Sequence, residues 1–433
     1  MAREMKDSGI EWIGKIPVEW NVRPIKNSFS IVSGSTPNSD KAEYWDGDIA
    51  WITPADFKTI DKYTSGGSRY ITKEGYNSCS TCIIPKGSII FSKRAPIGSV
   101  VINTIDLCTN QGCLSCIKND KTDSVFFYYI MSVYDDVFNQ FGSGTTFKEI
   151  SATTFSDFIL PLPPLEEQKL ISSFLDSKCS KIDKAIEYTK ISIEEYKKLK
   201  QSIITEAVTK GLNPNVEFKD SGIKWIGEIP SHWNASSLKR VLSIIKDGTH
   251  GTFQRTSQGR LLLSAKNVFE DGLHFFEHDS RVSEEDYNSI VANGFPQKDD
   301  VLMCCVGTIG RTMVYQELEP IAFQRSVSFL RCNNLMLPEY LNFFLNNSEI
   351  QKEEILMARG TAQVGLYMGD VLNLHIAIPP IEEQKDIIKY LKTRIGEINP
   401  IIKSKEKLIE ELTAYRKSLI YEYVTGKKEV PAI

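Results

Sequence analysis

Two short clusters carry the residue types of a metal-dependent nuclease. Glu167-Gln168-Lys169 and Glu383-Gln384-Lys385 each match the E-x-K half of a restriction-nuclease metal site. That site also needs a β-strand and a preceding aspartate, whereas both clusters follow a Pro-Pro pair and open a helical pattern. We therefore interpret them as solvated helix starts, where glutamates favour the positive end of the helix dipole.

Four cysteines have the spacing of a zinc site. Cys79-x-x-Cys82 and Cys113-x-x-Cys116 could together supply four thiolates. Neither pair is followed by glycine, the second half of the chain has no counterpart, and positions i and i+3 of a strand face opposite ways. We expect these cysteines to be structural thiols and expect no metal site.

The sequence holds no recognisable catalytic motif. It contains no G-x-x-x-x-G-K-[ST] phosphate loop and no HExxH. Its Pro-Pro pairs continue into Leu165 and Ile381, so they do not form the Asn/Asp-Pro-Pro-aromatic element of adenine methyltransferases. His274 and His278 have helical ligand spacing but lie in a glycine-flanked stretch, where surface or packing roles are favoured. We expect no catalytic residue and no cofactor in this chain.

Length and composition describe an ordinary soluble protein. The 433 residues suffice for two or three domains, and the nine cysteines are expected to be reduced. The N-terminus lacks an apolar signal region, and no apolar stretch approaches the roughly 18 residues of a membrane helix, so we predict a cytoplasmic protein with no membrane contact. The net charge of −4 argues against a uniformly basic nucleic-acid binder but leaves room for local basic patches.

The sequence contains an internal repeat. KDSGIEWIGKIPVEW at residues 6–20 returns as KDSGIKWIGEIPSHW at 219–233, and LPPLEEQK at 162–169 returns as IPPIEEQK at 378–385. The shifts of 213 and 216 residues indicate one tandem duplication. Between these anchors the two copies diverge almost completely. Two similar scaffolds that read different targets explain this pattern.

Each diverged block is a mixture of short β-rich runs and turns, such as GSIIFS in the first block and DDVLMCC in the second. Helical periodicity appears only late in each block, so we predict two similar α+β domains, each on a curved or barrel-like sheet. The predicted divisions are a first recognition domain at 1–160, a helical spacer at 161–211, a second recognition domain at 212–376, a second spacer at 377–427 and a tail at 428–433.

After each Pro-Pro pair, apolar residues recur at alternating steps of three and four, which predicts a heptad seam. Each helix could run about 40 residues, or roughly 60 Å. A long helix with one apolar stripe needs a partner, and we expect an antiparallel intramolecular coiled coil of the two repeats. Pro400 predicts a kink, or a restart with Asn399 as N-cap. The predicted seam comprises Ile182, Ile186, Ile193, Tyr196 and Ile203 with Ile398, Ile402, Ile409, Leu412 and Leu419.

The duplicated SGIEWIGKIPVEW, SGIKWIGEIPSHW, LPPLEEQK and IPPIEEQK, which flank two dissimilar blocks, resemble the specificity subunits of type I restriction-modification systems. The resemblance covers residues 6–427, nearly the whole chain. It implies that two target-recognition domains each read one half of a split, asymmetric site on double-stranded DNA. It also implies that the helices dock two methyltransferase subunits, which endonuclease/translocase subunits join. S-adenosylmethionine, ATP and Mg²⁺ would then belong to those partners.

The DNA-facing residues should be donors in loops of the diverged blocks, because Arg, Asn and Gln can contact base edges bidentately while Lys holds phosphate. For any one of them, an exposed loop residue without a base contact is the simpler interpretation. The candidates are Lys93, Arg94, Asn110, Gln111, Thr145, Thr146 and Lys148 in the first block, and Lys246, Thr249, His250, Arg255, Lys266, Asn267, Arg311, Gln324, Arg325, Arg359 and Gln363 in the second.

Two other functions stay open at this point. A self-contained DNA methyltransferase is disfavoured by the missing cofactor loop and catalytic motif. A coiled-coil protein adaptor without DNA specificity is disfavoured by the two diverged globular blocks.

Overall fold

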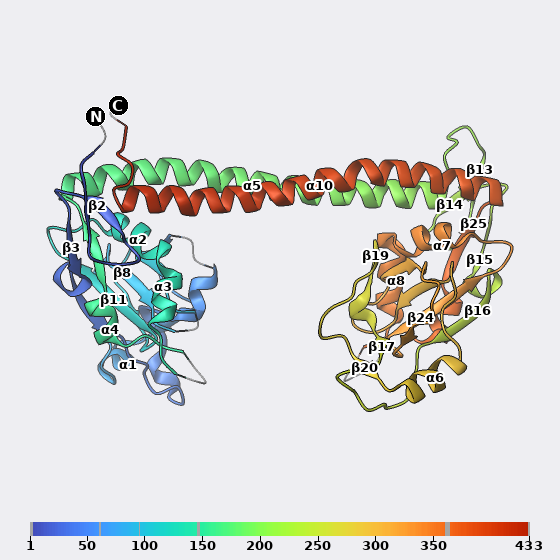
Figure 1. The fold of residues 1–433 in the computed structure, drawn as a ribbon, viewed down its shortest axis with the longest axis horizontal. Helices are drawn as coiled ribbons and strands as arrows, with labels where there is room; N and C mark the ends of the chain where they lie inside the picture. The colour runs from blue at the N-terminus through green and yellow to red at the C-terminus, as the bar shows by residue number, and fades with distance from the viewer. Residues whose placement is uncertain (1–2, 60–61, 95, 145–147, 360–363, 432–433) are drawn as a thin grey trace. The chain divides into compact units, whose positions relative to one another are not determined.

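The computed structural model describes all residues except 1–2, 60–61, 95, 145–147, 360–363 and 432–433. Its contacts divide the chain into two compact units (Figure 1): unit 1 holds residues 1–189 and 407–433, and unit 2 holds residues 190–406. Two long helices, α5 (Leu165–Lys210) and α10 (Ile381–Val424), each contribute one half to each unit.

Unit 1 is built on two mixed sheets. The larger has the order β4 (Phe29–Ser33), β11 (Cys113–Lys118), β8 (Ile89–Ser92), β9 (Val100–Asn103) and β6 (Tyr63–Thr64). The smaller has the order β10 (Cys108–Thr109), β5 (Trp45–Ile52) and β7 (Arg69–Ile71). Two ribbons pair β1 (Met5–Asp7) with β2 (Lys15–Pro17) and β3 (Asn21–Pro24) with β12 (Ile159–Leu162). The shorter helices are α1 (Lys73–Asn77), α2 (Ser124–Val133), α3 (Asp135–Gln140) and α4 (Ala152–Asp157).

Unit 2 repeats this plan. One sheet has the order β16 (Leu242–Asp247), β24 (Val327–Cys332), β21 (Val301–Cys304) and β22 (Thr312–Val314), and another has the order β20 (Arg281–Val282), β17 (Arg260–Leu263) and β23 (Ala322–Phe323). Ribbons pair β13 (Phe218–Asp220) with β14 (Glu228–Pro230), β15 (Asn234–Ser237) with β25 (His375–Ile378), and β18 (Val268–Phe269) with β19 (Gly272–Leu273). The shorter helices are α6 (Glu284–Ala292), α7 (Pro338–Leu345), α8 (Ser348–Met357) and α9 (Met368–Asn373).

The predicted internal repeat is confirmed by strand order. The run β4-β11-β8-β9 of unit 1 corresponds to β16-β24-β21-β22 of unit 2, with the same antiparallel pairings. In both units the smaller sheet contains one parallel pair, which is β10 with β5 in unit 1 and β23 with β17 in unit 2. The two diverged blocks therefore share one α+β framework.

Two local expectations differ from the structure. Instead of one curved or barrel-like sheet, the strands of each unit are divided among several small sheets. Helix α6 lies early in its block, where no helix is predicted. Serine is a preferred N-cap residue, and Ser283 caps this helix: its hydroxyl accepts a hydrogen bond from the Asp286 N–H at 3.0 Å.

The long helices pack antiparallel inside each unit, as predicted. In unit 1, Phe174 of α5 contacts Tyr423 of α10 with ring centroids 4.5 Å apart, while Asp183 further along α5 pairs with Arg416 at 2.8 Å. In unit 2, Ile204 and Val208 of α5 share one core with Ile387 and Leu391 of α10. The helices lie side by side at one end of each unit's core (Figure 1).

The predicted seam residues differ in burial. Ile182, Ile193, Ile398 and Leu419 are buried, whereas Ile186, Tyr196, Ile203, Ile402, Ile409 and Leu412 are partly exposed.

The predicted helix restart at Pro400 is wrong, because α10 continues through it. Pro400 and Gly396, the residue four positions earlier, are both exposed. Water can therefore reach the Gly396 carbonyl, which lacks its helical donor because proline has no N–H. Within the described part of the chain, none of the helices has the length and apolar character needed to cross a bilayer.

Candidate nucleic-acid interface

In unit 1, three loops meet at one edge of the sheets. Gly34, after β4, lies so close to Thr109 that a Cβ on Gly34 would be 2.0 Å from the Thr109 carbonyl oxygen. The neighbouring Ser35 N–H donates to that same oxygen at 3.0 Å. The third loop joins through Lys93, whose N–H donates to the Gly112 carbonyl at 3.0 Å. The ends of β4, β8 and β10 are thus held together by backbone contacts.

The basic side chains of this cluster share one carboxylate. Lys93 pairs with Glu149 at 2.8 Å and its side chain is only 14% exposed, while Arg94 is 3.9 Å from the same carboxylate and 37% exposed. Gly112 makes room for Arg94, because a Cβ there would be 2.8 Å from the Arg94 Nε. Lys148 is exposed beside this pair. Arg94 and Lys148 are therefore available to a ligand, while Lys93 is largely internal.

The two amides of the second loop differ in availability. Asn110 is 9% exposed and its Oδ1 accepts a hydrogen bond from the Gly112 N–H at 2.9 Å. The structure therefore argues against a base contact by Asn110, because its side chain shapes its own turn. Gln111 is exposed and bonds the Thr36 hydroxyl. The predicted residues Thr145 and Thr146 lie outside the described residues.

Unit 2 builds the same loop arrangement from different side chains. A Cβ on Gly248 would lie 2.3 Å from the Gln324 carbonyl oxygen, just as Gly34 lies against Thr109. The Thr249 N–H donates to the Phe323 carbonyl at 2.7 Å, and the Arg325 N–H donates back to the Thr249 carbonyl at 3.0 Å. Arg325 is exposed and Gln324 is partly exposed.

Three of the predicted residues, Lys246, Thr249 and His250, line a hollow of about 320 Å³ in unit 2. Its wall includes the aromatic rings of Phe323 and Phe329. The His250 ring lies 3.4 Å from the Asp247 carboxylate, and its side chain is 64% exposed. This hollow places three donors beside the loop cluster, next to the buried residues Phe323 and Phe329.

The remaining unit 2 candidates are engaged to different extents. Asn267 is fully buried, and its amide donates to the Asp279 carboxylate at 2.8 Å. Asn267 closes a capping box inside the fold, and its contact with DNA stays a prediction that this burial disfavours. Lys266 pairs with the same Asp279 at 2.8 Å, and Arg311 donates to the Val268 carbonyl at 2.8 Å.

Two other predicted arginines of unit 2 are exposed. Arg255 donates to the Phe253 carbonyl at 3.1 Å, and Arg359 pairs with Asp370 at 3.2 Å with a 74% exposed side chain. Gln363 lies outside the described residues.

Sequence reasoning missed Arg69. Its guanidinium carbon lies 3.4 Å from the ring centroid of Trp45, yet the residue is exposed. The adjacent Trp51 donates its indole N–H to the Ser35 carbonyl at 3.1 Å, which links this cation–π pair to the loop cluster. The sequence shows only two tryptophans, Trp45 and Trp51, followed by an arginine well over ten residues later. These residues come together only because β5 and β7 pair.

The Glu167-Gln168-Lys169 cluster, which matches half of a nuclease metal site, makes contacts that support the fold. Gln168 is fully buried, and its amide nitrogen donates to the Pro163 carbonyl at 2.9 Å while its oxygen accepts from the Asp123 N–H at 2.9 Å. Lys169 forms an exposed pair with Glu166 at 2.8 Å. This cluster therefore joins the start of helix α5 to the loop before α2 in unit 1.

The cysteine pairs do not converge. Cys113 and Cys116 are both buried but belong to different core clusters, as expected for positions i and i+3 of a strand. Burial raises the pKa of Cys108 to about 11 and also raises that of Cys82, which keeps these thiols protonated at neutral pH. Among the described residues, no group of three or more His, Cys, Asp or Glu side chains could hold a metal ion.

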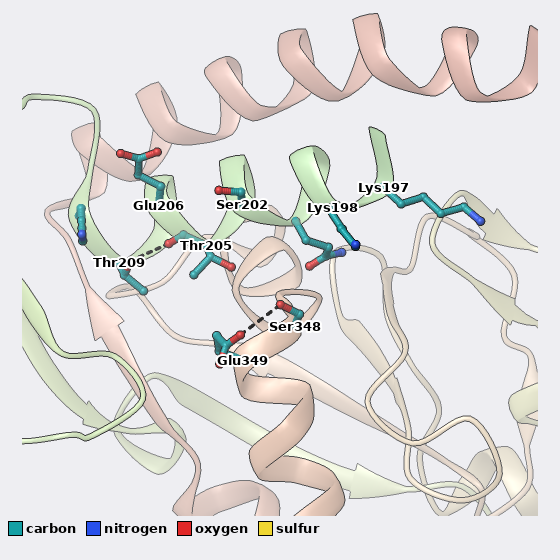
Figure 2. A pocket seen from close by; sticks show the side chains of 10 residues that line it. Lys197, Lys198, Ser202, Thr205, Glu206, Thr209, Ser348 and Glu349 are labelled. Carbon is teal, nitrogen blue, oxygen red and sulfur yellow. Dashed lines mark hydrogen bonds between the residues drawn. The ribbon is translucent and has the colours of Figure 1, made fainter. Parts of the chain in front are cut away.

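A polar groove of about 630 Å³ lies along the end of α5 in unit 2. Figure 2 shows the side chains of Lys197, Lys198 and Thr205 on α5, with Ser348 and Glu349 at the start of α8 across from them. Amines, hydroxyls and carboxylates alternate here, which suits a polar protein surface more than a catalytic centre.

Comparison with known proteins decides the family. The sequence model of the family described as "Type I restriction modification DNA specificity domain" matches residues 17–195 and 230–413. The chain belongs to this family. The specificity domain thus occurs twice, in agreement with the duplicated anchors, and the chain is a type I restriction-modification specificity subunit with two DNA-recognition domains. This is a non-enzymatic role.

Relatives of this specificity subunit match it over most of their length. The type I restriction enzyme MjaIX specificity subunit of Methanocaldococcus jannaschii is 28% identical over 96% of this chain and 95% of the relative. The type I restriction enzyme EcoBI specificity subunit of Escherichia coli is 25% identical over 74% of this chain and 69% of the relative. A chain from a structure on "complex assembly and conformational transition of the type I R-M system" has a TM-score of 0.72 at 16% identity, covering 95% of this chain and 99% of that chain, which shows a shared fold.

Proposed function

We propose that this specificity subunit reads a bipartite, asymmetric site on double-stranded DNA, with one half-site for each unit. It docks two methyltransferase subunits through its long helices, and endonuclease/translocase subunits join that complex. S-adenosylmethionine, ATP and Mg²⁺ bind to those partner subunits and not to this chain.

One observation carries this proposal: the same loop framework presents different side chains in the two units. The glycine that touches the neighbouring loop is Gly34 in unit 1 and Gly248 in unit 2. The loop it touches continues with Asn110-Gln111 in unit 1 and with Gln324-Arg325 in unit 2. Unlike donors on a like framework are what two unlike half-sites require.

Exposure and pairing divide the candidates into two groups. The available donors for base edges or phosphates are Arg94, Gln111 and Lys148 in unit 1, and Lys246, Thr249, His250, Arg255, Gln324, Arg325 and Arg359 in unit 2. Lys93 and Arg311 are paired within the fold and hold the loops in place, while Lys266 is exposed although it pairs with Asp279. Thr145, Thr146 and Gln363 remain candidates on sequence grounds alone.

The polar outer surface of the helices supports the docking role. In unit 2 the groove of Figure 2 offers Lys197, Lys198 and Glu206 on α5 beside Glu349 of α8. The rim of a protein–protein interface is polar and solvent-accessible, which is where such groups would lie.

Replacing residues 21–160 by the corresponding block of another specificity subunit tests the proposal. Mapping of methylated sites in cells that carry the chimera should show one changed half-site and one unchanged half-site. The matched control replaces residues 234–376 and should change the other half. A change of both halves by either chimera, or of neither, would contradict the assignment of one half-site to each unit.

A further inference from the structure

Near its N-terminus, unit 1 holds one of its own arginines in an acidic site. Arg3 donates to both oxygens of Glu167, from Nη1 to Oε1 at 2.5 Å and from Nη2 to Oε2 at 3.0 Å. Its Nε donates to Glu19 at 2.6 Å, and its side chain is only 13% exposed. The guanidinium also lies 5.4 Å from the ring centroid of Trp20. This is a bidentate, stacked guanidinium site.

The duplication places the same framework in unit 2. Strand β13 pairs with β14 from Phe218 to Pro230 in the register that β1 and β2 use from Met5 to Pro17. Glu383 takes the place of Glu167 and accepts the Trp233 indole N–H at 2.9 Å. His232 takes the place of Glu19 and lies 2.7 Å from Glu383.

The residue that corresponds to Arg3 is Val216, which precedes its strand by the same two positions. Valine is too short to reach the carboxylate. At this place unit 2 has a pocket of about 230 Å³, which is lined by Leu212, Asn213, Val216, His232, Glu383, Asp386 and Ile387.

Helix α10 gives the pocket two carboxylates, Glu383 and Asp386. Asp386 is exposed and stands where unit 1 has Leu170. Glu383 is 38% exposed on its side chain, so a carboxylate remains reachable from solvent. None of the described lining residues is a lysine or an arginine. An apolar floor from Ile387 and Leu212, with carboxylates at the rim, suits the aliphatic stem and planar head of one arginine.

We propose that this pocket binds an arginine side chain presented by a partner polypeptide. We expect a polypeptide because unit 1 fills the equivalent site with an arginine from the segment directly before β1. A free amino acid is disfavoured because its own carboxylate would lie near Glu383 and Asp386.

A labelled tryptophan gives a local readout of binding. In the full-length chain with ¹⁵N-tryptophan, the Trp233 indole N–H reports on Glu383 and is assigned with Trp233→Phe. N-acetyl-L-arginine amide, the probe for peptide-borne arginine, should shift this resonance with a Kd of about 1 mM, since the carboxylates are partly solvated. N-acetyl-L-citrulline amide, which has the same shape but no charge, should leave it unmoved.

Two variants at Val216 make the test specific. Val216→Arg should occupy the pocket from within and abolish the shift, whereas the isosteric Val216→Thr should keep it. Asp386→Asn should weaken binding several-fold without touching the Trp233 contact. An equal response to the citrulline probe, or undiminished binding to Val216→Arg, would overturn the site.

Free L-arginine decides the source of the ligand. It should bind more weakly than the amide probe, and tighter binding by free L-arginine would assign the pocket to a small molecule and overturn the partner proposal. No shift with any probe would overturn the proposal as a whole.

Discussion

The indole nitrogen of Trp20 donates a hydrogen bond to the Glu167 carboxylate at 2.8 Å, across 147 residues of sequence. Trp20 belongs to the first anchor and Glu167 to the Pro-Pro-anchored helix start. The same ring touches the end of the other long helix, where a Cβ on Gly426 would lie 3.1 Å from it. Trp233 repeats both contacts with Glu383 and Gly211. The duplicated motifs thus form one joint that holds the start of one long helix and the end of the other.

Loss of the Trp20 donor should destabilise unit 1. Trp20→Phe leaves the Glu167 carboxylate without one of its bonds, at a cost of about 1 to 3 kcal/mol in the free energy of unfolding. Urea unfolding measures this cost. Trp12→Phe is the matched control, because the buried Trp12 indole N–H has no hydrogen-bond partner in the described structure. If both variants lost the same stability, ring packing and not the hydrogen bond would be responsible.

Glycine at the two helix ends should be intolerant of a side chain. Gly211 and Gly426 have φ of 74° and 69°, and a Cβ on Gly426 would lie 2.4 Å from the Pro17 Cδ. Alanine at either position should cost about 1 to 2 kcal/mol. Gly396→Ala is the contrasting variant, because Gly396 lies inside α10 and a Cβ added there would meet no atom within 4 Å, so it should stabilise the helix by about 0.5 to 1 kcal/mol. Thermal unfolding of the three variants in parallel would expose an error in either sign.

The buried Glu354 should make stability fall with rising pH. Burial raises the pKa of its carboxyl from 4.5 to about 8, and neither oxygen has a hydrogen-bond partner in the described structure. Between these pH values the unfolded chain loses the proton that the folded chain keeps. Stability should therefore decline from about pH 4.5 to pH 8, by about 3 to 5 kcal/mol at most.

Glu354→Gln should remove this decline and leave the variant more stable than the wild type at pH 8. Chemical unfolding at a series of pH values gives the comparison, with Glu353→Gln on the same helix as the control. A wild-type profile identical in slope to that of Glu354→Gln would show that Glu354 is ionised in the fold.

The two exposed loop arginines should act on different half-sites. In the assembled complex, Arg94→Ala should weaken DNA binding or relax bases only in the half read by unit 1, and Arg325→Ala only in the half read by unit 2. A base contact would cost about 1 to 3 kcal/mol and relax one position, whereas a phosphate contact would weaken all sequences and lower the salt dependence. Lys169→Ala, in an exposed pair at the start of α5, should change neither. Identical methylation maps and affinities for all three variants would remove both arginines from the interface.

Local periodicity and repetition are enough to predict the framework of this protein from its residues. The matching anchors predict two like domains, and heptad spacing predicts two long helices that need each other. Short β-rich runs bounded by turn residues predict strands such as β8 and β21. Each of these signals is carried by residues within one or two turns or one strand, where the chain's own geometry limits the choices.

Which polar residues are free to act depends instead on tertiary contacts. Asn267 and Arg325 are both donors in predicted loops, yet Asn267 is buried against Asp279 while Arg325 is exposed. Likewise Arg3 and Val216 occupy one register position, but the guanidinium site and the pocket exist only because a hairpin and a distant helix start come together. Asn267 is paired with a residue 12 positions away and Arg3 with one 164 positions away, and neither pairing is recorded in a local pattern of residues.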